Sequence, residues 1–480
     1  MRRGAWGEVM TQPVPSEEPL SQLAERTEQR ILEQISPSAE LMARVDGVRR
    51  SLVERAEAIA RSRGRPLVRA LVAGSAARGT YIADRLDIDL FLLYPPDTPR
   101  EVLAEEGLAL GRELVRHPEQ RYAEHPYLRG EFEGFRVEAV PGYAITDPSR
   151  PISAVDRTPF HQEYLAQRQT PAMVGQVRLT KQFLRGLGIL GSEARTEGFS
   201  GYLIELLILR YGSLRGLLRE ARSWPIPMRI DATARDPPRL PGEVALILPD
   251  PVDPGRNVAS ALSRAHLGLF ILAAREYLLH PSEAWFVPYR TPRLSREEAG
   301  QREARRGTRV TVVELPRDPA VVDDTLYPQI FRAARVMREA LEREGFTPLG
   351  AAGTAGGPRV IVVLETAEAE RPALRVREGP PPGIDRVGEF LGKWEERTGE
   401  LLQGPYVRPD GKLAVETRRE TRRVEAVLEA LLPTLSLGRD LDAARQRSFT
   451  VRPLSEAPES EPLETALAEL LAKQLPWRRR

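Results

Sequence analysis

Two aspartates separated by a single residue, Asp87 and Asp89, stand in the apolar segment "DIDLFLLYP". Alternate side chains of a strand point to the same face, so both carboxylates share one face while Ile88 and Leu90 face the core. Adjacent carboxylates repel each other unless a divalent cation neutralises them. The pair therefore predicts a binding site for a hard cation such as Mg²⁺.

A phosphate-binding turn is predicted just before these aspartates, in "VAGSAARGT". A strand ends at Ala73, Gly74 allows a tight turn, and Ser75 begins a helix whose N-terminal amides can receive a phosphate. Either pattern alone is common, but the two together are typical of the nucleotidyltransferase superfamily that includes polymerase-β-like enzymes. That chemistry requires a third carboxylate on a neighbouring strand, and Glu138 in "VEAVP" is the candidate.

A site of this kind transfers a nucleotide with the help of two metal ions. One cation lowers the pKa of the attacking hydroxyl, and the other holds the triphosphate and stabilises the leaving pyrophosphate. We therefore expect Mg²⁺ as the cofactor, with Asp87, Asp89 and Glu138 as both the catalytic residues and the metal ligands.

Lysine is scarce in this chain, because only four of the 70 basic residues are lysines and Lys181 is the only one before Lys393. A lysine ammonium is a compact charge that suits a phosphate oxygen, whereas arginine offers a planar fork. Lys181 is therefore a candidate triphosphate contact. The alternative, an ordinary surface lysine, stays open on this evidence alone.

The elements that must position these residues begin with an α/β unit. Apolar residues at helical spacing predict a long amphipathic helix from residue 36 to 64, after a polar N-terminal segment. Strands follow in "PLVRALVAGS", "DIDLFLLYP" and "FRVEAVP", with a helix over residues 99–116. Residues 154–289 read as mainly helical. Beyond 306, the pattern predicts two strands flanking the helix "TLYPQIFRAARVMREALEREG", a hairpin turned at Asp410-Gly411 and a helix over residues 416–431.

Composition excludes several classes of protein. Hydrophobic residues at 41% and charged residues at 29% are ordinary for a folded globular chain. No apolar run approaches the ~18 residues of a membrane helix, so we expect no membrane contact and a cytoplasmic location. The absence of cysteine excludes disulfides, thiolate zinc sites and a cysteine nucleophile. The net charge of +2 says nothing about nucleic acid.

Longer segments resemble the archaeal-type (class I) CCA-adding tRNA nucleotidyltransferases along the whole chain. The similar segments are "RYAEHPY", "SAVDRTPFH", "VRLTKQFLRGLGILG", "GFSGYLIELLILRYGS", "DPVDPGRNVA", "FRAARVMREALEREGF" and "GPYVRPDGKLAVETRRE". The resemblance implies a multidomain α+β fold with a polymerase-β-like nucleotidyltransferase head over residues 1–153 and a helical neck with the nucleotide-base pocket over 154–290. It also implies an α/β body with a tail, binding tRNA, over 291–454. Residues 455–480 form a C-terminal extension whose basic end, "LPWRRR", we expect to be unstructured.

The same resemblance implies the function and the partners. It predicts addition of C, C and A to the 3′ end of tRNA without a template, from CTP and ATP, with release of pyrophosphate. It also assigns the nucleotide-binding residues: Gly74, Ser75 and Arg78 at the phosphate turn, and His161 and Lys181 on the phosphates. Arg256 is implied to read the Watson-Crick edge of the base.

Three residues depart from the family's pattern. The family usually has Glu-x-Asp where this chain has Asp87 and Asp89, and Asp in place of Glu138. It has a tyrosine near the nucleotide where this chain has Leu190. The carboxylates keep their charge, so metal binding is expected to survive, whereas loss of the tyrosine hydroxyl removes one contact to the phosphate or sugar.

Alternatives remain open at this point. A poly(A) or oligoadenylate-type polymerase would share the catalytic strands and would use ATP without CTP. A degenerate, non-catalytic tRNA-binding relative is the other alternative, which the retained carboxylates argue against. The helix face formed by Arg332, Arg335 and Arg338 either is solvated or follows RNA phosphates. The sequence leaves open whether the protein forms a homodimer.

Overall fold

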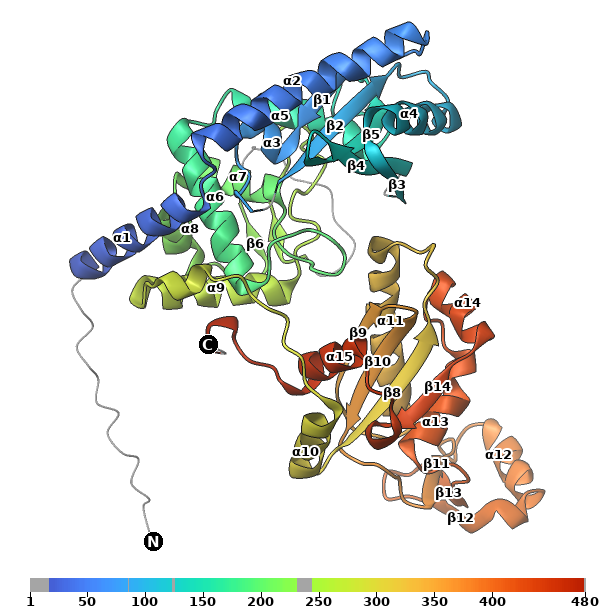
Figure 1. The fold of residues 1–480 in the computed structure, drawn as a ribbon. Helices are drawn as coiled ribbons and strands as arrows, with labels where there is room; N and C mark the ends of the chain where they lie inside the picture. Colours follow the sequence, from blue (N-terminus) through green and yellow to red (C-terminus); the bar gives the residue numbers. More distant parts are fainter. Residues whose placement is uncertain (1–16, 85, 123–125, 231–243, 479–480) are drawn as a thin grey trace. The chain divides into compact units, whose positions relative to one another are not determined.

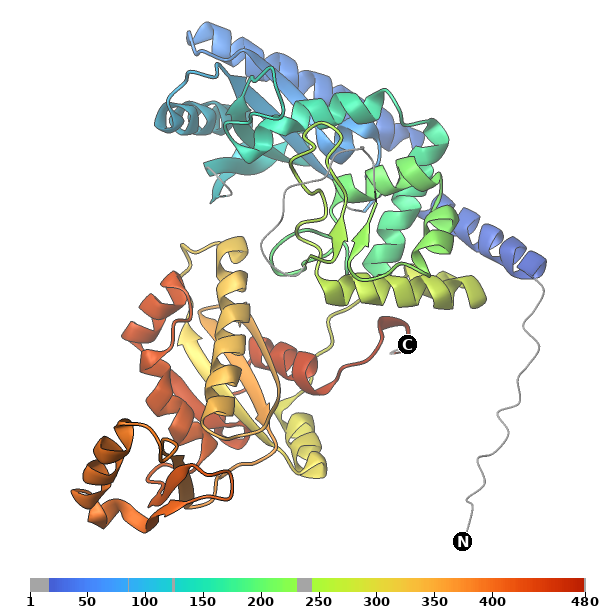
Figure 2. The same ribbon diagram turned by 180° about the vertical axis from the view of Figure 1, so that it is seen from behind.

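The computed structural model describes residues 17–84, 86–122, 126–230 and 244–478. Its contacts divide the chain into two compact units: residues 1–290 together with 474–480, and residues 291–473. Figure 1 and Figure 2 show the two units from opposite sides. Within the described ranges, no helix is both long enough and apolar enough to cross a membrane. The finer boundaries predicted from the sequence stay a prediction.

A five-stranded sheet carries the predicted catalytic segment, with the strand order β1-β2-β5-β4-β3. β2 (Asp87–Tyr94) lies antiparallel to β1 (Arg69–Ala73) and parallel to β5 (Phe135–Tyr143). The outer strands β4 (Pro126–Phe132) and β3 (Arg116–Tyr122) complete the sheet. The sequence did not predict this outer pair, because β3 is an edge strand with the polar sequence "RHPEQRY".

Two helices cover one face of this sheet, α2 (Ala39–Ser62) and α4 (Arg100–Leu114), and α2 runs across it in Figure 1. Ile88 and Leu90 of β2 are fully buried in the core on that side. Because side chains alternate along a strand, Asp87 and Asp89 face the opposite side. The helix expected from Ser36 begins later, since Ser38 is the N-cap and accepts a hydrogen bond from the Leu41 amide at 3.1 Å.

A helical bundle completes the first unit around a second apolar core. Its helices are α1 (Glu17–Ile35), α5 (Thr158–Ala166), α6 (Pro171–Leu187), α7 (Gly201–Tyr211), α8 (Leu214–Ala221) and α9 (Arg264–Leu279), with the 3₁₀ turns η1 (Ala154–Arg157) and η2 (Glu283–Phe286). The short strands β6 (Met228–Arg229) and β7 (Leu246–Ile247) pair in parallel, and the five-residue helix α3 (Gly74–Arg78) follows β1. The sequence missed α1, whose buried residues are sparse among polar ones.

The C-terminal end of the chain returns to this bundle. Trp477, in the 3₁₀ turn η6 (Pro476–Arg478), packs against Trp285 with the rings tilted and their centroids 4.8 Å apart. Pro476 beside it is buried. The expectation of an unstructured end was therefore wrong for residues 475–478, because one tryptophan supplies enough apolar surface to dock the segment.

The second unit contains a four-stranded antiparallel sheet with the order β14-β8-β10-β9. Its strands are β8 (Arg309–Pro316), β9 (Pro348–Gly356), β10 (Arg359–Thr366) and β14 (Thr450–Pro453). One face packs against α10 (Arg296–Arg306) and α15 (Glu461–Leu471), and the other against α11 (Asp323–Arg343), α13 (Val424–Leu431) and α14 (Arg439–Arg447). β9 was not predicted, since "PLGAAGTAG" lacks the large β-branched residues typical of strands.

A smaller sheet, ordered β11-β13-β12, projects from this unit. It comprises β11 (Leu374–Glu378), β12 (Leu401–Val407) and β13 (Leu413–Arg418), with α12 (Arg386–Glu395) and the 3₁₀ turn η3 (Thr398–Glu400) alongside. Two further turns are η4 (Leu432–Thr434) and η5 (Leu454–Glu456). The predicted hairpin at Asp410-Gly411 joins β12 to β13 and is confirmed. The helix expected from residue 416 was wrong at its start, because residues 414–418 pair with β11 instead.

Candidate active site

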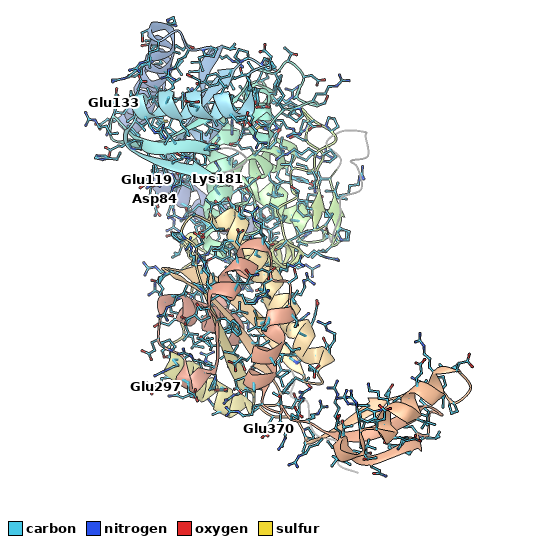
Figure 3. All side chains as sticks on the ribbon, turned by 90° about the vertical axis from the view of Figure 1, so that its right-hand side faces the viewer. Asp84, Glu119, Glu133, Lys181, Glu297 and Glu370 are labelled. Carbon is cyan, nitrogen blue, oxygen red and sulfur yellow. The ribbon has the colours of Figure 1, made fainter. Side chains whose placement is uncertain are left out.

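A cleft of about 280 Å³ in the first unit brings most of the predicted site residues together. Its lining includes the three predicted carboxylates, the second residue of α3 and one basic residue of α6: Asp87, Asp89, Glu138, Ser75 and Lys181. Leu190 and its neighbours Gly191 to Glu193 line it as well. Lys181 is labelled in Figure 3.

Strand register places the carboxylates side by side. Asp89 is the Cα partner of Glu138 across the parallel β2–β5 pair, and Asp87 lies two residues before it on the same face. The Arg129 Nε donates to Glu138 Oε1 at 2.9 Å. A terminal nitrogen of Arg136 lies 3.5 Å from Asp87 Oδ1. The sequence did not identify Arg129 or Arg136, although both are strand neighbours of the carboxylates.

Asp89 carries the least compensated charge of the three. Burial, followed by the negative charges of Glu138 and Asp87, raises the pKa of Asp89 to about 7, against only a small opposing effect of Arg78. A divalent cation would relieve this repulsion, and Mg²⁺ typically takes one or two carboxylates together with substrate phosphates. Within the described ranges no three acidic or histidine side chains are already grouped around a common point. Asp87 and Asp89 therefore offer two carboxylates on one face to such an ion, while Glu138 is hydrogen-bonded to Arg129.

Gly74 is required at the turn for two independent reasons. Its φ of +72° lies in the left-handed region that favours glycine. A Cβ at this position would also clash with the carboxylate of Asp89. The turn thus lets the backbone before Ser75 approach the carboxylates closely.

The predicted triphosphate contacts Arg78 and Lys181 both take part in hydrogen bonds between the helical bundle and residues 78–80. Glu205 of α7, which is 1% exposed, accepts from Arg78 Nε at 2.7 Å and from the Thr80 hydroxyl at 2.7 Å. The Lys181 Nζ donates to the Thr80 carbonyl at 2.9 Å. Gln162 also accepts from Arg78. Arg78 is therefore an ion-paired residue and is absent from the cleft lining described above, whereas Lys181 is part of it.

His161 and Arg256 meet at a second cluster, outside the cleft lining. Both lie 2.8 Å from Asp250 Oδ2, through Nε2 of the histidine and a terminal nitrogen of the arginine. The Tyr202 hydroxyl donates to Asp250 Oδ1 at 3.0 Å, and its ring stacks on His161 with centroids 4.0 Å apart. Although burial alone would raise the pKa of Asp250, the hydrogen bond and charge of His161 hold it below the usual value, with help from the Val252 amide and Arg256.

Sequence reasoning singled out neither Asp250 nor Tyr202. Asp250 begins the segment "DPVDPGRNVA" that carries part of the family resemblance, so the signal was present. Tyr202 lies in "GFSGYL", where an aromatic residue reads as core. Its pKa is raised by burial and by the adjacent Asp250 charge, so the hydroxyl stays a donor.

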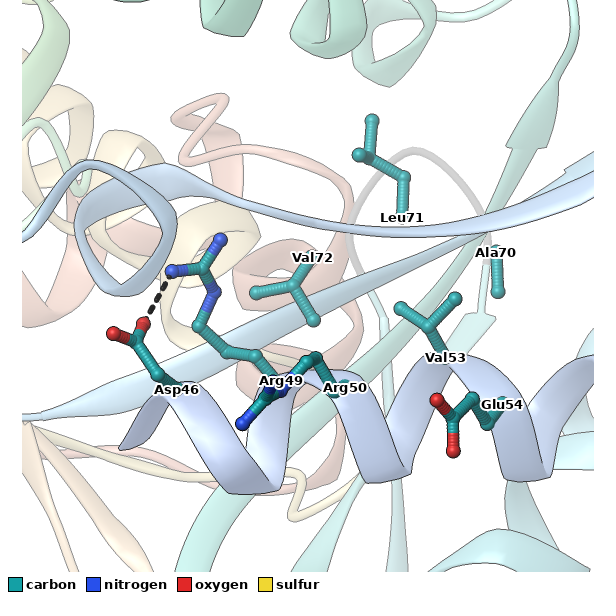
Figure 4. Close-up of a pocket in the computed structure, with 8 residues that line it drawn as sticks. All are labelled: Asp46, Arg49, Arg50, Val53, Glu54, Ala70, Leu71 and Val72. Carbon is teal, nitrogen blue, oxygen red and sulfur yellow. Dashed lines mark hydrogen bonds and ion pairs between the residues drawn. The ribbon is translucent and has the colours of Figure 1, made fainter. Parts of the chain in front are cut away.

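A second cavity of the first unit, about 570 Å³, contains none of the predicted site residues. It lies between α2 and the edge strand β1, and Figure 4 shows its lining. Arg49 and Asp46, 2.8 Å apart, form an ion pair there. This cavity is larger than the cleft but offers no grouped carboxylates, so its size does not make it the site of the chemistry.

Three family models match the chain in succession. They are a nucleotidyltransferase domain over residues 53–161, the second domain of a tRNA nucleotidyltransferase over 175–287 and the C-terminal domain of a CCA-adding enzyme over 306–453. The CCA-adding enzyme of Halobacterium salinarum is 38% identical over 77% of this chain and 81% of its own length. The chain belongs to the CCA-adding enzyme family.

Other members of the CCA-adding family match over most of the chain. The enzyme of Methanosarcina barkeri is 34% identical over 88% of this chain and 92% of its own length. The enzyme of Thermoplasma volcanium is 34% identical over 86% of this chain and 90% of its own length. The resemblance stated from the motifs is thereby confirmed, as is the multidomain fold with a nucleotidyltransferase head.

Proposed function

We propose that this member of the CCA-adding family adds C, C and A to the 3′ end of tRNA from CTP and ATP with release of pyrophosphate. The observation that carries the proposal is the register of Asp89 beside Glu138, with Asp87 on the same face of a cleft that also contains Lys181. The match of residues 306–453 to the C-terminal domain of CCA-adding enzymes supports tRNA as the acceptor.

Asp87, Asp89 and Glu138 would hold Mg²⁺, which when bound lowers the pKa of the attacking hydroxyl and neutralises charge on the triphosphate. Ser75 and Lys181, which line the same cleft as the carboxylates, would bind the triphosphate oxygens. The Arg129 Nε donates to Glu138 Oε1 at 2.9 Å. Glu138 would exchange this hydrogen bond for the ion when the ion binds. Because the three carboxylates repel one another, binding of a divalent cation would be favourable even before the substrate binds.

His161 and Arg256 would act from the second cluster, on the phosphates and on the base respectively. Their shared partner, Asp250, fixes both side chains through one buried carboxylate. Leu190 lines the cleft without a polar atom, so it would contribute apolar surface where the family has a tyrosine.

The test is incorporation of labelled nucleotide into tRNA that lacks its 3′ end, with Mg²⁺ and either CTP or ATP. The proposal expects CTP to be incorporated first and ATP only after two cytidines. Incorporation of ATP alone would indicate a poly(A)-type polymerase, and binding of tRNA without incorporation would indicate a non-catalytic relative. A parallel reaction with EDTA checks the metal requirement.

A further inference from the structure

Glu205 of α7 is a buried carboxylate that lies close to the phosphate turn but outside the cleft lining. Its Oε2 accepts from the Arg78 Nε at 2.7 Å, and its Oε1 accepts from Nη2 of the same guanidinium at 3.3 Å. Oε1 also accepts from the Thr80 hydroxyl at 2.7 Å. One carboxylate, with only 1% of the residue exposed, thus binds two positions directly after the phosphate turn.

Thr80 connects Glu205 to the second predicted triphosphate contact. The Lys181 Nζ donates to the Thr80 carbonyl at 2.9 Å and to its hydroxyl oxygen at 3.4 Å. The threonine hydroxyl donates to Glu205, which leaves its oxygen as the acceptor for the ammonium. Arg78 of α3 and Lys181 of α6 are therefore joined through one buried acid, although they come from different elements.

A second basic residue of α6 binds the same stretch of chain. Arg178, one turn before Lys181, donates to the Gly79 carbonyl at 2.6 Å and to the Tyr81 carbonyl at 3.2 Å. Together with the contacts of Glu205, these hydrogen bonds attach every residue from 78 to 81 to α6 or α7. The bundle therefore determines where the chain leaves the phosphate turn.

Pairing with Glu205 still leaves part of the Arg78 guanidinium available to a ligand. An arginine side chain has five N–H donors. Within the described part of the chain, two of them go to Glu205 and one to Gln162 of α5. Burial and the two neighbouring carboxylates raise the pKa of Asp89, whereas the charge of Arg78 opposes that rise. The charge of the paired arginine therefore still acts on the cleft.

A triphosphate binds most tightly to cations that are already in position. Arginine and lysine side chains have many rotamers, and ordering them when a ligand binds reduces the affinity. Glu205 binds Arg78 directly and Lys181 through Thr80, so both side chains would be ordered before the nucleotide binds. The two cations outnumber the single carboxylate, so the cluster keeps a positive charge that attracts an anion.

We propose that Glu205 is a positioning residue for the triphosphate of the incoming nucleotide, acting through Arg78 and Lys181. This role rests on the proposed function, since it takes the cleft as the binding site of a nucleoside triphosphate. Because the effect passes through two cations that contact phosphate, it applies equally to CTP and ATP. It does not depend on the base.

The test is Glu205→Gln in the full chain, with binding of CTP and of cytidine monophosphate measured in Mg²⁺ without tRNA. Glutamine keeps the shape of the side chain but removes the charge that binds Arg78. We expect CTP and ATP to bind about 10-fold more weakly, and cytidine monophosphate less than about 2-fold more weakly. In the addition assay, KM for CTP and ATP should rise by the same factor, while kcat stays within about 3-fold and tRNA affinity is unchanged.

Glu28→Gln is the matched control. Glu28 is also buried in the first unit, where it accepts from the Arg215 Nε at 3.0 Å and from the Tyr277 hydroxyl at 3.1 Å. It therefore has the same kinds of partner as Glu205, but it joins α1 to α8 and α9, away from the cleft lining. Its substitution should lower stability without changing the affinity for CTP. Equal losses of CTP affinity in the two variants would overturn the proposal, because they would report structural damage alone.

Thr80→Val keeps the proposal testable if the Glu205 variant does not fold. Valine has the shape of threonine without the hydroxyl, so it breaks the link from Glu205 to Lys181 and leaves the pair with Arg78 in place. CTP should then bind about 3-fold more weakly, as expected for one lost hydrogen bond. Unchanged CTP affinity in either variant, once folded, would overturn the proposal.

The binding measurement also separates this proposal from the proposed function. CTP binding needs no acceptor RNA, so the effect of Glu205→Gln is measured whether or not the protein extends tRNA. A wild type that binds CTP but adds no nucleotide to tRNA would contradict the proposed function alone. Weaker CTP binding by the Glu205 variant of such a protein would still support the positioning role.

Discussion

Two carboxylates in the first unit, Asp89 and Asp250, are set in opposite electrostatic environments. Asp89 faces two other carboxylates, and burial and this repulsion raise its pKa to about 7. Asp250 is completely buried, yet its pKa is held below the usual value, because hydrogen bonds and positive charge outweigh burial. His161, Tyr202 and Arg256 supply those partners.

The difference in pKa direction distinguishes the cleft, whose carboxylates lack a compensating cation, from the Asp250 cluster, whose carboxylate already has its partners within the protein. The mutual repulsion of the cleft carboxylates is unfavourable, so a bound cation would stabilise this site most. The charge of Asp250 is already compensated by its hydrogen bonds and by nearby positive charge. Its carboxylate therefore serves to orient the side chains of His161 and Arg256. Burial alone would not distinguish the two, whereas the sign of the charge around each one does.

The largest effect is expected for Asp89→Asn. Loss of the central metal ligand should lower kcat for both CTP and ATP addition by more than about 1000-fold, in the range typical of essential catalytic groups. tRNA affinity should stay near the wild-type value. The matched control is Asp84→Asn, an exposed carboxylate paired with Arg185 at 2.8 Å and labelled in Figure 3. Appreciable addition by the Asp89 variant would refute the assignment of the metal site.

The same variant should make the metal-free protein more stable. A carboxyl whose pKa is about 7 when folded and near 3.8 when unfolded favours folding at low pH, and this advantage is lost as pH rises from about 4 to about 7. Asp89→Asn removes that loss, so its free energy of unfolding, measured by thermal unfolding with EDTA at pH 8, should be about 1–3 kcal/mol higher than that of the wild type. Mg²⁺ should stabilise the wild type more at pH 8 than at pH 6, and the variant much less at either pH.

An intermediate effect is expected for Asp250→Asn. Breaking a buried charge cluster by removing its central partner costs about 3–5 kcal/mol of stability, and His161 and Arg256 lose their common anchor. KM for CTP and ATP should therefore rise by about 10-fold or more, with a smaller change in kcat. Asp253→Asn is the comparison, since the Asp253 carboxylate pairs with Arg157 at 2.8 Å, and the change leaves in place the backbone carbonyl that accepts from the Arg256 amide at 2.9 Å. It should lower stability without changing KM, and equal effects on KM would remove the special role of Asp250.

How much of this site could be predicted from the sequence depends on how far apart along the chain the contacting residues lie. Asp87 and Asp89 share a face because strand alternation is a local rule, and Glu138 was found because the chemistry demanded a third carboxylate nearby. The role of Asp250 was hidden, because its contact with His161 joins residues 89 positions apart. The ion pair of Arg78 with Glu205, 127 positions apart, was equally out of reach. Long-range pairs of this kind depend on tertiary packing that no spacing rule encodes.

The fold shows the same limit. Strands rich in branched apolar residues, such as β2 and β10, were predicted, whereas the polar edge strand β3 and the glycine-rich β9 were missed. Both missed strands owe their conformation to pairing with a neighbouring strand rather than to their own propensity. The docking of Trp477 on Trp285 was unpredictable for the same reason, since the two lie nearly two hundred positions apart.

A smaller effect is expected from exchanging the lengths of two cleft carboxylates. Relative to the family pattern, Asp87 is one methylene shorter and Glu138 one methylene longer. Asp87→Glu alone should crowd the cleft and Glu138→Asp alone should draw the carboxylate away from the metal position, so each should lower kcat for CTP addition by about 10-fold. The double variant should recover much of the loss. A double-mutant cycle measures the coupling, and losses that simply add would show that the two positions are independent.

The smallest effect is expected for Tyr202→Phe, which removes one hydroxyl from the satisfied cluster and leaves the ring stacked on His161. Asp250 would lose one of its hydrogen bonds but keep His161, Arg256 and the Val252 amide, so stability should fall by only about 1 kcal/mol. KM for the nucleotides should rise by no more than about 3-fold. If Tyr202→Phe instead matched Asp250→Asn in its effect on KM, the hydroxyl itself would contact the nucleotide, and the cluster would be a binding site rather than an internal support.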